Sequence, residues 1–112
     1  MAELIVLNYL EEHMSVPAYM EKPTQNKPER FLLIERTGGG ETEHLPSATL
    51  AIQSYAESLY QASVLNKELK NVMKKIIALD EIRGITLNND YNFTDTRTKE
   101  YRYQAVYDIR YY

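Results

Sequence analysis

The sequence of 112 residues contains no cysteine, which excludes disulfides and thiolate metal sites. It has no tryptophan, only 4 glycines and 4 prolines, and no apolar run long enough for a membrane span. The longest apolar run near the start, residues 4–7, lacks the basic flank and the cleavage site of a signal peptide. We therefore expect the protein to stay in the cytosol where it is made.

Positive charge is also scarce. The chain has 13 Lys and Arg against 16 Asp and Glu, a formal net charge of −3, and a pI near 5.4. Tight nucleic-acid binding depends on clustered cations, so we expect no sequence-specific nucleic acid among its partners. The 44% of hydrophobic residues is typical of a single globular domain, here residues 1–112, and the unusual feature is the count of 10 tyrosines.

The first half of the chain predicts one helix and three strands. Apolar residues at steps of three and four predict an amphipathic helix over residues 2–13, ended by Pro17. We expect its apolar side to carry Leu4, Leu7, Leu10 and Met14. A short strand at 17–20 and a loop at 21–29 follow. The segment 30–37 begins apolar on both faces and predicts a covered strand, which the glycines at 38–40 end. Residues 38–46 are expected to form a flexible connection, mobile in the free subunit, before a strand over 47–55.

The second half predicts a long helix and a hairpin. Ser58 and Gln61 fit a capping box at the start of a helix. Its apolar stripe contains Leu65, Leu69, Val72, Ile76 and Leu79. Alternation of apolar and polar residues predicts strands over 85–93 and 101–111, joined by a polar turn at 94–99.

These elements, in the order αβββαββ, predict an α+β fold with a mostly antiparallel sheet of about five strands and both helices on one face. The other face is left uncovered. Depending on its orientation, the last strand exposes on that face either its tyrosines or the side that carries Val106 and the arginines. The tyrosines favour cross-strand core packing and a protein interface about equally.

Candidate chemistry is sparse. The triple glycine lacks the Lys-Ser/Thr of a phosphate loop, and no serine lies in a nucleophile elbow. His13 and His44 are the only histidines and have no zinc-ligand spacing, while the group Glu41, Glu43 and His44 lies on the expected mobile tip. The lysines of the long helix, residues 67, 70, 74 and 75, favour a solvated face over phosphate contacts. We therefore expect no catalytic residue, no metal, no cofactor and no enzyme.

Six segments together carry a family resemblance. They are residues 7–19 (LNYLEEHMSVPAY), 28–40 (PERFLLIERTGGG), 49–55, the long helix after Ser58, 91–95 (YNFTD) and 101–105 (YRYQA). In this order they resemble the tail terminator proteins, also called tail completion or minor tail proteins, of bacteriophages with long non-contractile tails. The chain departs from the family in the turn 94–99, which has neither the proline nor the glycine that relatives often show.

The resemblance implies a structural protein that forms a hexameric ring on the head-proximal end of the tail tube. There it would stop tube growth and present a surface to the head-tail connector, without chemistry, in the host cytoplasm during assembly and in the virion tail afterwards. Its expected partners are further copies of itself, the tail tube protein and the connector, with no membrane. The residues expected at its interfaces are Glu35, Arg36, Thr37, Gly38, Gly39, Gly40, Tyr91, Phe93, Tyr101 and Tyr103.

Alternatives stay open from the sequence. The sheet face and the glycine loop could enclose a metabolite in a small-ligand or regulatory domain, or the chain could be a neighbouring connector or minor capsid component. Glu35 and Arg36 could also pair across strands within one subunit instead of meeting a neighbour.

Overall fold

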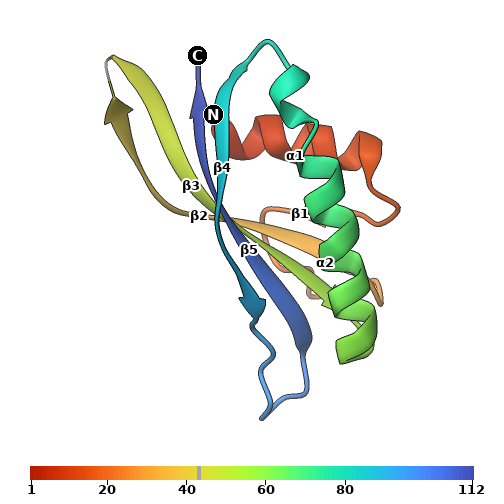
Figure 1. Cartoon of the computed structure of the whole chain (residues 1–112). Helices are drawn as coiled ribbons and strands as arrows, with labels where there is room; N and C mark the ends of the chain where they lie inside the picture. The colour runs from red at the N-terminus through yellow and green to blue at the C-terminus, as the bar shows by residue number, and fades with distance from the viewer. Residues whose placement is uncertain (43) are drawn as a thin grey trace.

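The computed structural model of the chain describes residues 1–42 and 44–112 as two helices and a short 3₁₀ turn packed on one side of a twisted sheet (Figure 1). The elements are α1 (Ala2–His13), β1 (Ala18–Tyr19), β2 (Phe31–Thr42), β3 (Leu45–Ala56), α2 (Leu59–Met73), η1 (Ile76–Ala78), β4 (Ile82–Asn92) and β5 (Tyr101–Tyr111). The sheet has the order β1-β2-β3-β5-β4, with β1 parallel to β2 and the other pairs antiparallel. The expected α+β class is therefore confirmed. Within the described residues, no helix is long and apolar enough to cross a membrane.

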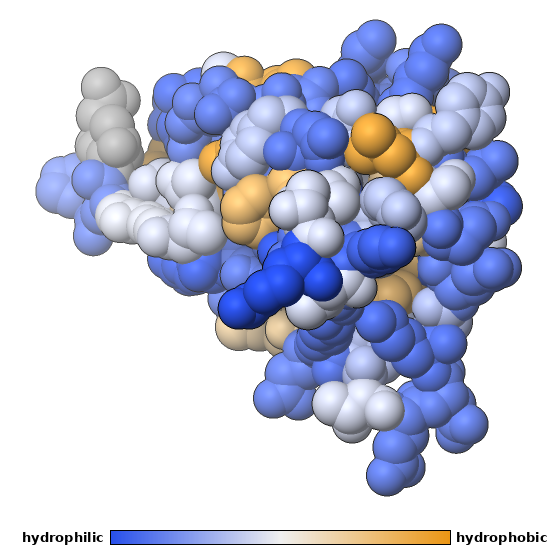
Figure 2. Space-filling model, turned by 90° about the horizontal axis from the view of Figure 1, so that it is seen from below, coloured by the Kyte–Doolittle hydropathy of each residue, from blue (hydrophilic) through white to orange (hydrophobic). Residues whose placement is uncertain are grey.

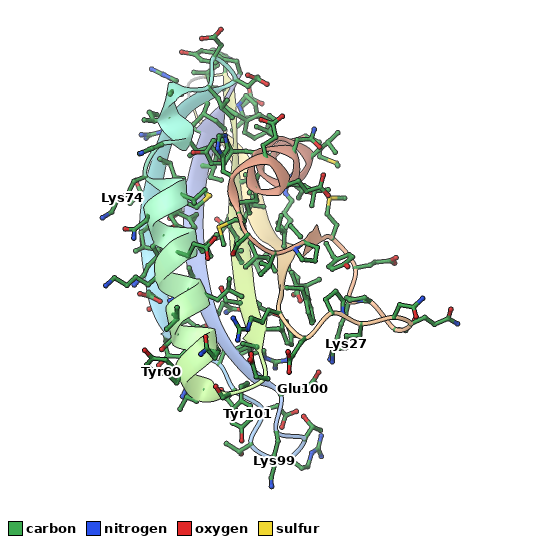
Figure 3. All side chains as sticks on the ribbon, turned by 90° about the vertical axis from the view of Figure 1, so that its right-hand side faces the viewer. Lys27, Tyr60, Lys74, Lys99, Glu100 and Tyr101 are labelled. Atoms are coloured by element: carbon green, nitrogen blue, oxygen red, sulfur yellow. The ribbon has the colours of Figure 1, made fainter. Side chains whose placement is uncertain are left out.

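The main core lies between the sheet and the helices. Leu50 and Ile52 of β3 are fully buried there, and Ile52 lies opposite Ile34 on β2 and Ala105 on β5. Because alternate strand residues point to opposite faces, their neighbours in sequence lie on the other side of the sheet. Figure 3 shows α2 and α1 next to each other in front of the sheet, with the loop that carries Lys27 extending to one side.

The helix α1 has the predicted bounds but a different buried face. Val6 and Leu10 are fully buried and Tyr9 nearly so, whereas Leu4 is 46% exposed. The predicted face was wrong at Leu4 because the helix is apolar on more than one side, so spacing alone did not fix its rotation. Packing against the sheet determines which side of α1 is buried.

The glycine run does not end a strand, which corrects the sequence prediction. The β2 strand continues through Gly38, Gly39 and Gly40 to Thr42, paired with β3 residues up to Leu45. The expected flexible connection at 38–46 is thus a hairpin arm of two paired strands. It lies on the side of the molecule away from the helices (Figure 1). Ladder hydrogen bonds compensate the poor strand propensity of glycine. Glu43 lies outside the described residues.

The helix α2 begins as predicted, with the Ser58 hydroxyl accepting a hydrogen bond from the Gln61 backbone N–H at 3.2 Å. It ends earlier than the apolar stripe suggests. After Met73 the chain tightens into η1, where Ile76 is again buried. Met73 is 1% exposed and joins the core, while Val72 is only partly buried against it.

The last hairpin is confirmed, with both ends of its first strand shifted from the predicted range 85–93. The β5 strand matches the predicted range, while β4 starts at Ile82, three positions before the predicted Ile85, and the register shifts between Ile82 and Gly84. Tyr107 and Ile109 point toward the helices and are buried, so the tyrosine side of β5 faces the core. The side carrying Val106 and the arginines is left on the open face.

We expect Leu69→Ala to lower the free energy of unfolding by about 2–5 kcal/mol, because Leu69, in the second half of α2, is fully buried. Val64→Ala, on the same helix but 43% exposed, should change it by less than about 0.5 kcal/mol. Thermal and urea unfolding of both variants measure the difference. Equal stability of the two variants would contradict the assigned helix face.

Candidate functional site: the open sheet face and the hairpin arm

The interface residues expected from the sequence fall on both faces of the sheet. The open face carries Glu35, Gly38, Gly40, Tyr91 and Phe93. The helix-covered face carries Arg36, Gly39, Tyr101 and Tyr103. Thr37 is the extra residue where the β2 register shifts, and its hydroxyl donates to the Thr49 carbonyl oxygen at 3.4 Å. The structure therefore does not gather these residues into one patch.

A continuous series of hydrogen bonds between buried polar side chains, here called the polar chain, crosses the open face. Gln53 and Gln104 are only 4% and 8% exposed, although they lie on the face opposite the helices. The Gln53 Nε2 donates to Gln104 Oε1 at 2.8 Å, and the Tyr55 hydroxyl donates to Gln53 Oε1 at 3.1 Å. Gln104 Nε2 donates in turn to the Tyr91 hydroxyl. Because each amide has partners, burial of these groups is not penalised, and their side chains are held in fixed orientations.

Aromatic rings surround this chain. Phe31 and Tyr55 stack with their centroids 4.5 Å apart, and Tyr19 meets Phe31 edge-on at 5.9 Å. The guanidinium of Arg102 lies 4.6 Å from the centroid of Phe93 and donates to the Tyr55 hydroxyl at 2.9 Å. This part of the open face thus resembles a small second hydrophobic core, which is covered by the guanidinium of Arg102 rather than by a helix.

The loop before β2 covers one end of this aromatic cluster. The ammonium groups of Lys22 and Lys27 lie 5.5 and 5.7 Å from the ring centroids of Tyr55 and Phe31. Both lysines also pair with the carboxylate of Glu100, and the hydrogen bond from Lys22 is the main cause that lowers the Glu100 pKa. Figure 3 shows Lys27 and Glu100 toward the lower end of the sheet. This loop is therefore held to the sheet by charge as well as by packing.

The charged residues at the base of the arm do not pair with each other. Arg36 Nη1 lies 3.5 Å from the carboxylate of Glu3 on α1, and Arg36 Nε donates to the Gly38 carbonyl oxygen at 3.1 Å. Glu35 lies on the opposite face, where it is exposed and forms no hydrogen bond or ion pair with the described residues. The alternative of pairing within one subunit thus holds for Arg36, which meets Glu3, and not for Glu35 among the described residues, because neighbouring strand residues point to opposite sides.

The three glycines of the arm have different environments. A side chain at Gly39 would place its Cβ 2.2 Å from Arg36 Nη2 and 2.9 Å from the Ser47 carbonyl oxygen. At Gly38 and Gly40 the nearest atoms would be 3.8 Å away, an ordinary contact, and neither residue has a positive φ. Only Gly39 is thus required by the packing of the subunit itself. Since the glycines lie in a paired strand, they also form no loop that could enclose a metabolite.

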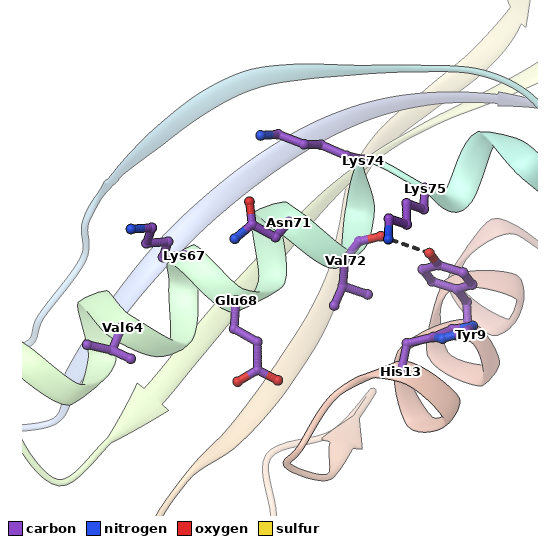
Figure 4. A pocket seen from close by; sticks show the side chains of 9 residues that line it. All are labelled: Tyr9, His13, Val64, Lys67, Glu68, Asn71, Val72, Lys74 and Lys75. Carbon is purple, nitrogen blue, oxygen red and sulfur yellow. Dashed lines mark hydrogen bonds between the residues drawn. The ribbon is translucent and has the colours of Figure 1, made fainter.

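A groove of about 710 Å³ separates α1 from α2 (Figure 4). Its lining residues are Tyr9, His13, Val64, Lys67, Glu68, Asn71, Val72, Lys74 and Lys75. The Tyr9 hydroxyl donates to the Val72 carbonyl oxygen at 2.8 Å and so ties the two helices together, while burial raises the pKa of Tyr9. Glu68 accepts hydrogen bonds from Ser15, whose backbone N–H lies 3.0 Å from Glu68 Oε2. The lysines of the groove lie beside Glu68, so its lining carries charges of both signs.

A neighbouring hollow lies between α2 and β4. It is floored by Met73, Leu87 and Tyr107, and burial is the main cause that raises the pKa of Tyr107 to about 12. Figure 2, which views the molecule from below, shows polar residues over most of the surface with apolar patches separated from one another. This view therefore shows no single broad apolar surface.

Sequence reasoning missed the polar chain of the open face. Its signal was present as polar Gln53 and Gln104 within strands, two residues from Tyr55 and Arg102 respectively. The partners lie on three different strands, so only the register brings them together.

A scan of the chain against models of known protein families gives no match, and a search of curated proteins gives no significant match either.

We expect Gly39→Ala and Gly40→Ala to have opposite effects on stability. The methyl group of Gly39→Ala displaces the Arg36 side chain and lies against the Ser47 carbonyl oxygen, so the melting temperature should fall. The methyl group of Gly40→Ala meets no clash, and it reduces the conformational entropy of the unfolded chain. This change should stabilise the fold by about 0.4–1 kcal/mol. Differential scanning calorimetry of both variants provides the comparison. A lower melting temperature for Gly40→Ala would contradict this view of the arm.

Proposed function

We propose that the protein is a phage tail terminator: copies associate into a ring, six in number by the family resemblance, that caps the head-proximal end of the tail tube. The observation that carries the proposal beyond the resemblance is the one-sided architecture of the sheet. Both helices cover one face, while the other face and the hairpin arm remain available for contacts.

The mechanism is capping by binding. One axial surface of the ring occupies the site that the next ring of tube subunits would use, and tube growth stops. The other axial surface meets the head-tail connector. Each contact can be weak by itself, since a ring presents it several times and the summed avidity holds the cap on the tube.

The open face supports this role through its rigidity. Tyr and Arg give large contact areas at protein interfaces, and here Tyr91, Phe93 and Arg102 are already held by hydrogen bonds and stacking. A surface ordered before binding loses little entropy when it binds. We propose that Tyr91 and Phe93 contact a partner, while Tyr101 and Tyr103 act mainly from the helix-covered side.

Complementation of a phage that lacks its terminator tests the assignment. With this protein supplied, we expect tails of uniform length joined to heads in electron micrographs, and without it long, unjoined tails. Normal joined tails in its absence would refute the assignment. Uniform tails with a head-joining defect alone would instead favour a connector component.

Reversing the charge of Arg36 tests whether the contact between the hairpin arm and α1 is needed for tail termination. Arg36→Glu places two acidic groups together and should weaken the contact between the arm and α1, worth about 0.2–1 kcal/mol for a surface pair. Glu3→Arg combined with Arg36→Glu re-forms the pair with reversed polarity and should restore both stability and tail termination. If termination remains lost in the stable double variant, Arg36 instead contacts another subunit.

A further inference from the structure

In the part of the chain that the structure describes, two long edges of the sheet have no neighbouring strand. β1 pairs only with Leu32 and Leu33, so the outer edge of β2 is free from Ile34 to Thr42. At the opposite side of the sheet, β4 ends the strand order and its outer edge is free over Ile82–Asn92. Free edges are sites of strand addition, and natural proteins usually shield them with lysine, proline or short strands. The free part of β2 contains neither lysine nor proline.

Strand directions make the two edges compatible. The order β2-β3-β5-β4 is antiparallel at every step, so β4 runs opposite to β2. When copies are related by rotation about an axis along the strands, β4 of the next copy therefore lies antiparallel to β2. The alternation of directions then continues from one copy into the next. This is a head-to-tail contact, the kind that generates rings.

The ladder also indicates a register. Gly40, Ser47, Arg110 and Gly84 lie in one row across the sheet. If the next copy is not shifted along the strand direction relative to the first, Gly40 of the first copy lies opposite Gly84 of the next copy. Arg83, one residue before Gly84, is the extra residue at the register shift of β4 and is exposed. Glu41, one residue after Gly40, is also exposed and lies beside Arg83 in this register, so opposite charges meet.

The alternative symmetric contact is less favourable. Pairing β2 with β2 of another copy about the centre of the free edge would bring Glu35 of one copy close to Glu41 of the other. Like charges opposite each other destabilise a strand pair. Gly38 and Gly40 add a separate indication, because the subunit has room for side chains there and glycine within a strand often marks the close approach of another backbone.

We propose that copies of this chain join by pairing the free edge of β2 with β4 of the next copy, antiparallel, with Glu41 beside Arg83. This inference rests on the proposed ring, but it is tested on the purified protein alone. The absence of cysteine makes disulfide trapping specific. Within one subunit the two positions lie on strands three spacings apart, about 14 Å, which is too far for a disulfide.

The experiment compares cysteine variants of the full chain under mild oxidation, read on non-reducing gels. A mixture of Glu41→Cys and Arg83→Cys chains should give dimers, and the double variant should give a ladder of higher species. Glu41→Cys mixed with Asn92→Cys, at the far end of β4, is the matched control and should give none. The charge-reversed variants Glu41→Arg and Arg83→Glu should each weaken association at least severalfold in light scattering, and their combination should restore it.

Three results would overturn the inference. Cross-links between Glu41→Cys and Glu35→Cys chains would show the symmetric contact, cross-links to Asn92→Cys would show the wrong direction or register, and no cross-link at millimolar concentration would show that these edges do not meet. Tail termination is measured separately by complementation. Cross-links of the expected pattern with failed complementation would reject the function and keep the interface, and the reverse outcome would reject only the interface.

Discussion

The fold depends on β3, which has a neighbouring strand on both sides along most of its length. Its Leu50 and Ile52 hold the helices to the sheet, and Gln53 and Tyr55 organise the open face from the opposite side of the same strand. Hydrogen bonding to both β2 and β5 fixes the register of the two faces at once. A shift of one residue would exchange the apolar and polar sets, so burial of the core specifies the polar chain as well.

The open face shows how a sheet without a covering layer can still be ordered. Glutamine amides in a dry site need partners, and the register supplies them from neighbouring strands. The aromatic rings beside them are covered by lysine and arginine rather than by aliphatic side chains. Such a surface is rigid without being strongly apolar, as the proposed contacts between proteins would require.

The hairpin arm shows the conflict between local propensity and pairing. Three consecutive glycines favour a flexible loop, yet each is part of a ladder that continues from the buried start of β2. Only Gly39 has a reason within the subunit, the guanidinium of Arg36 lying over it. The other two are the residues whose presence the isolated subunit does not explain, and the proposed contact between copies would account for them.

Spacing and local chemistry were enough to predict the α+β class, the element order, the capped start of α2 and the alternation of β5. Three features could be known only from the three-dimensional structure: the buried face of α1, the end of α2 and the continuation of β2 through the glycines. In these places packing and cross-strand hydrogen bonds outweigh local propensity. It alone brought Gln53, Gln104, Tyr91 and Arg102 together, since they belong to three strands that only the register aligns. It likewise separated Glu35 from Arg36, which are adjacent in sequence, since consecutive strand residues face opposite sides of the sheet.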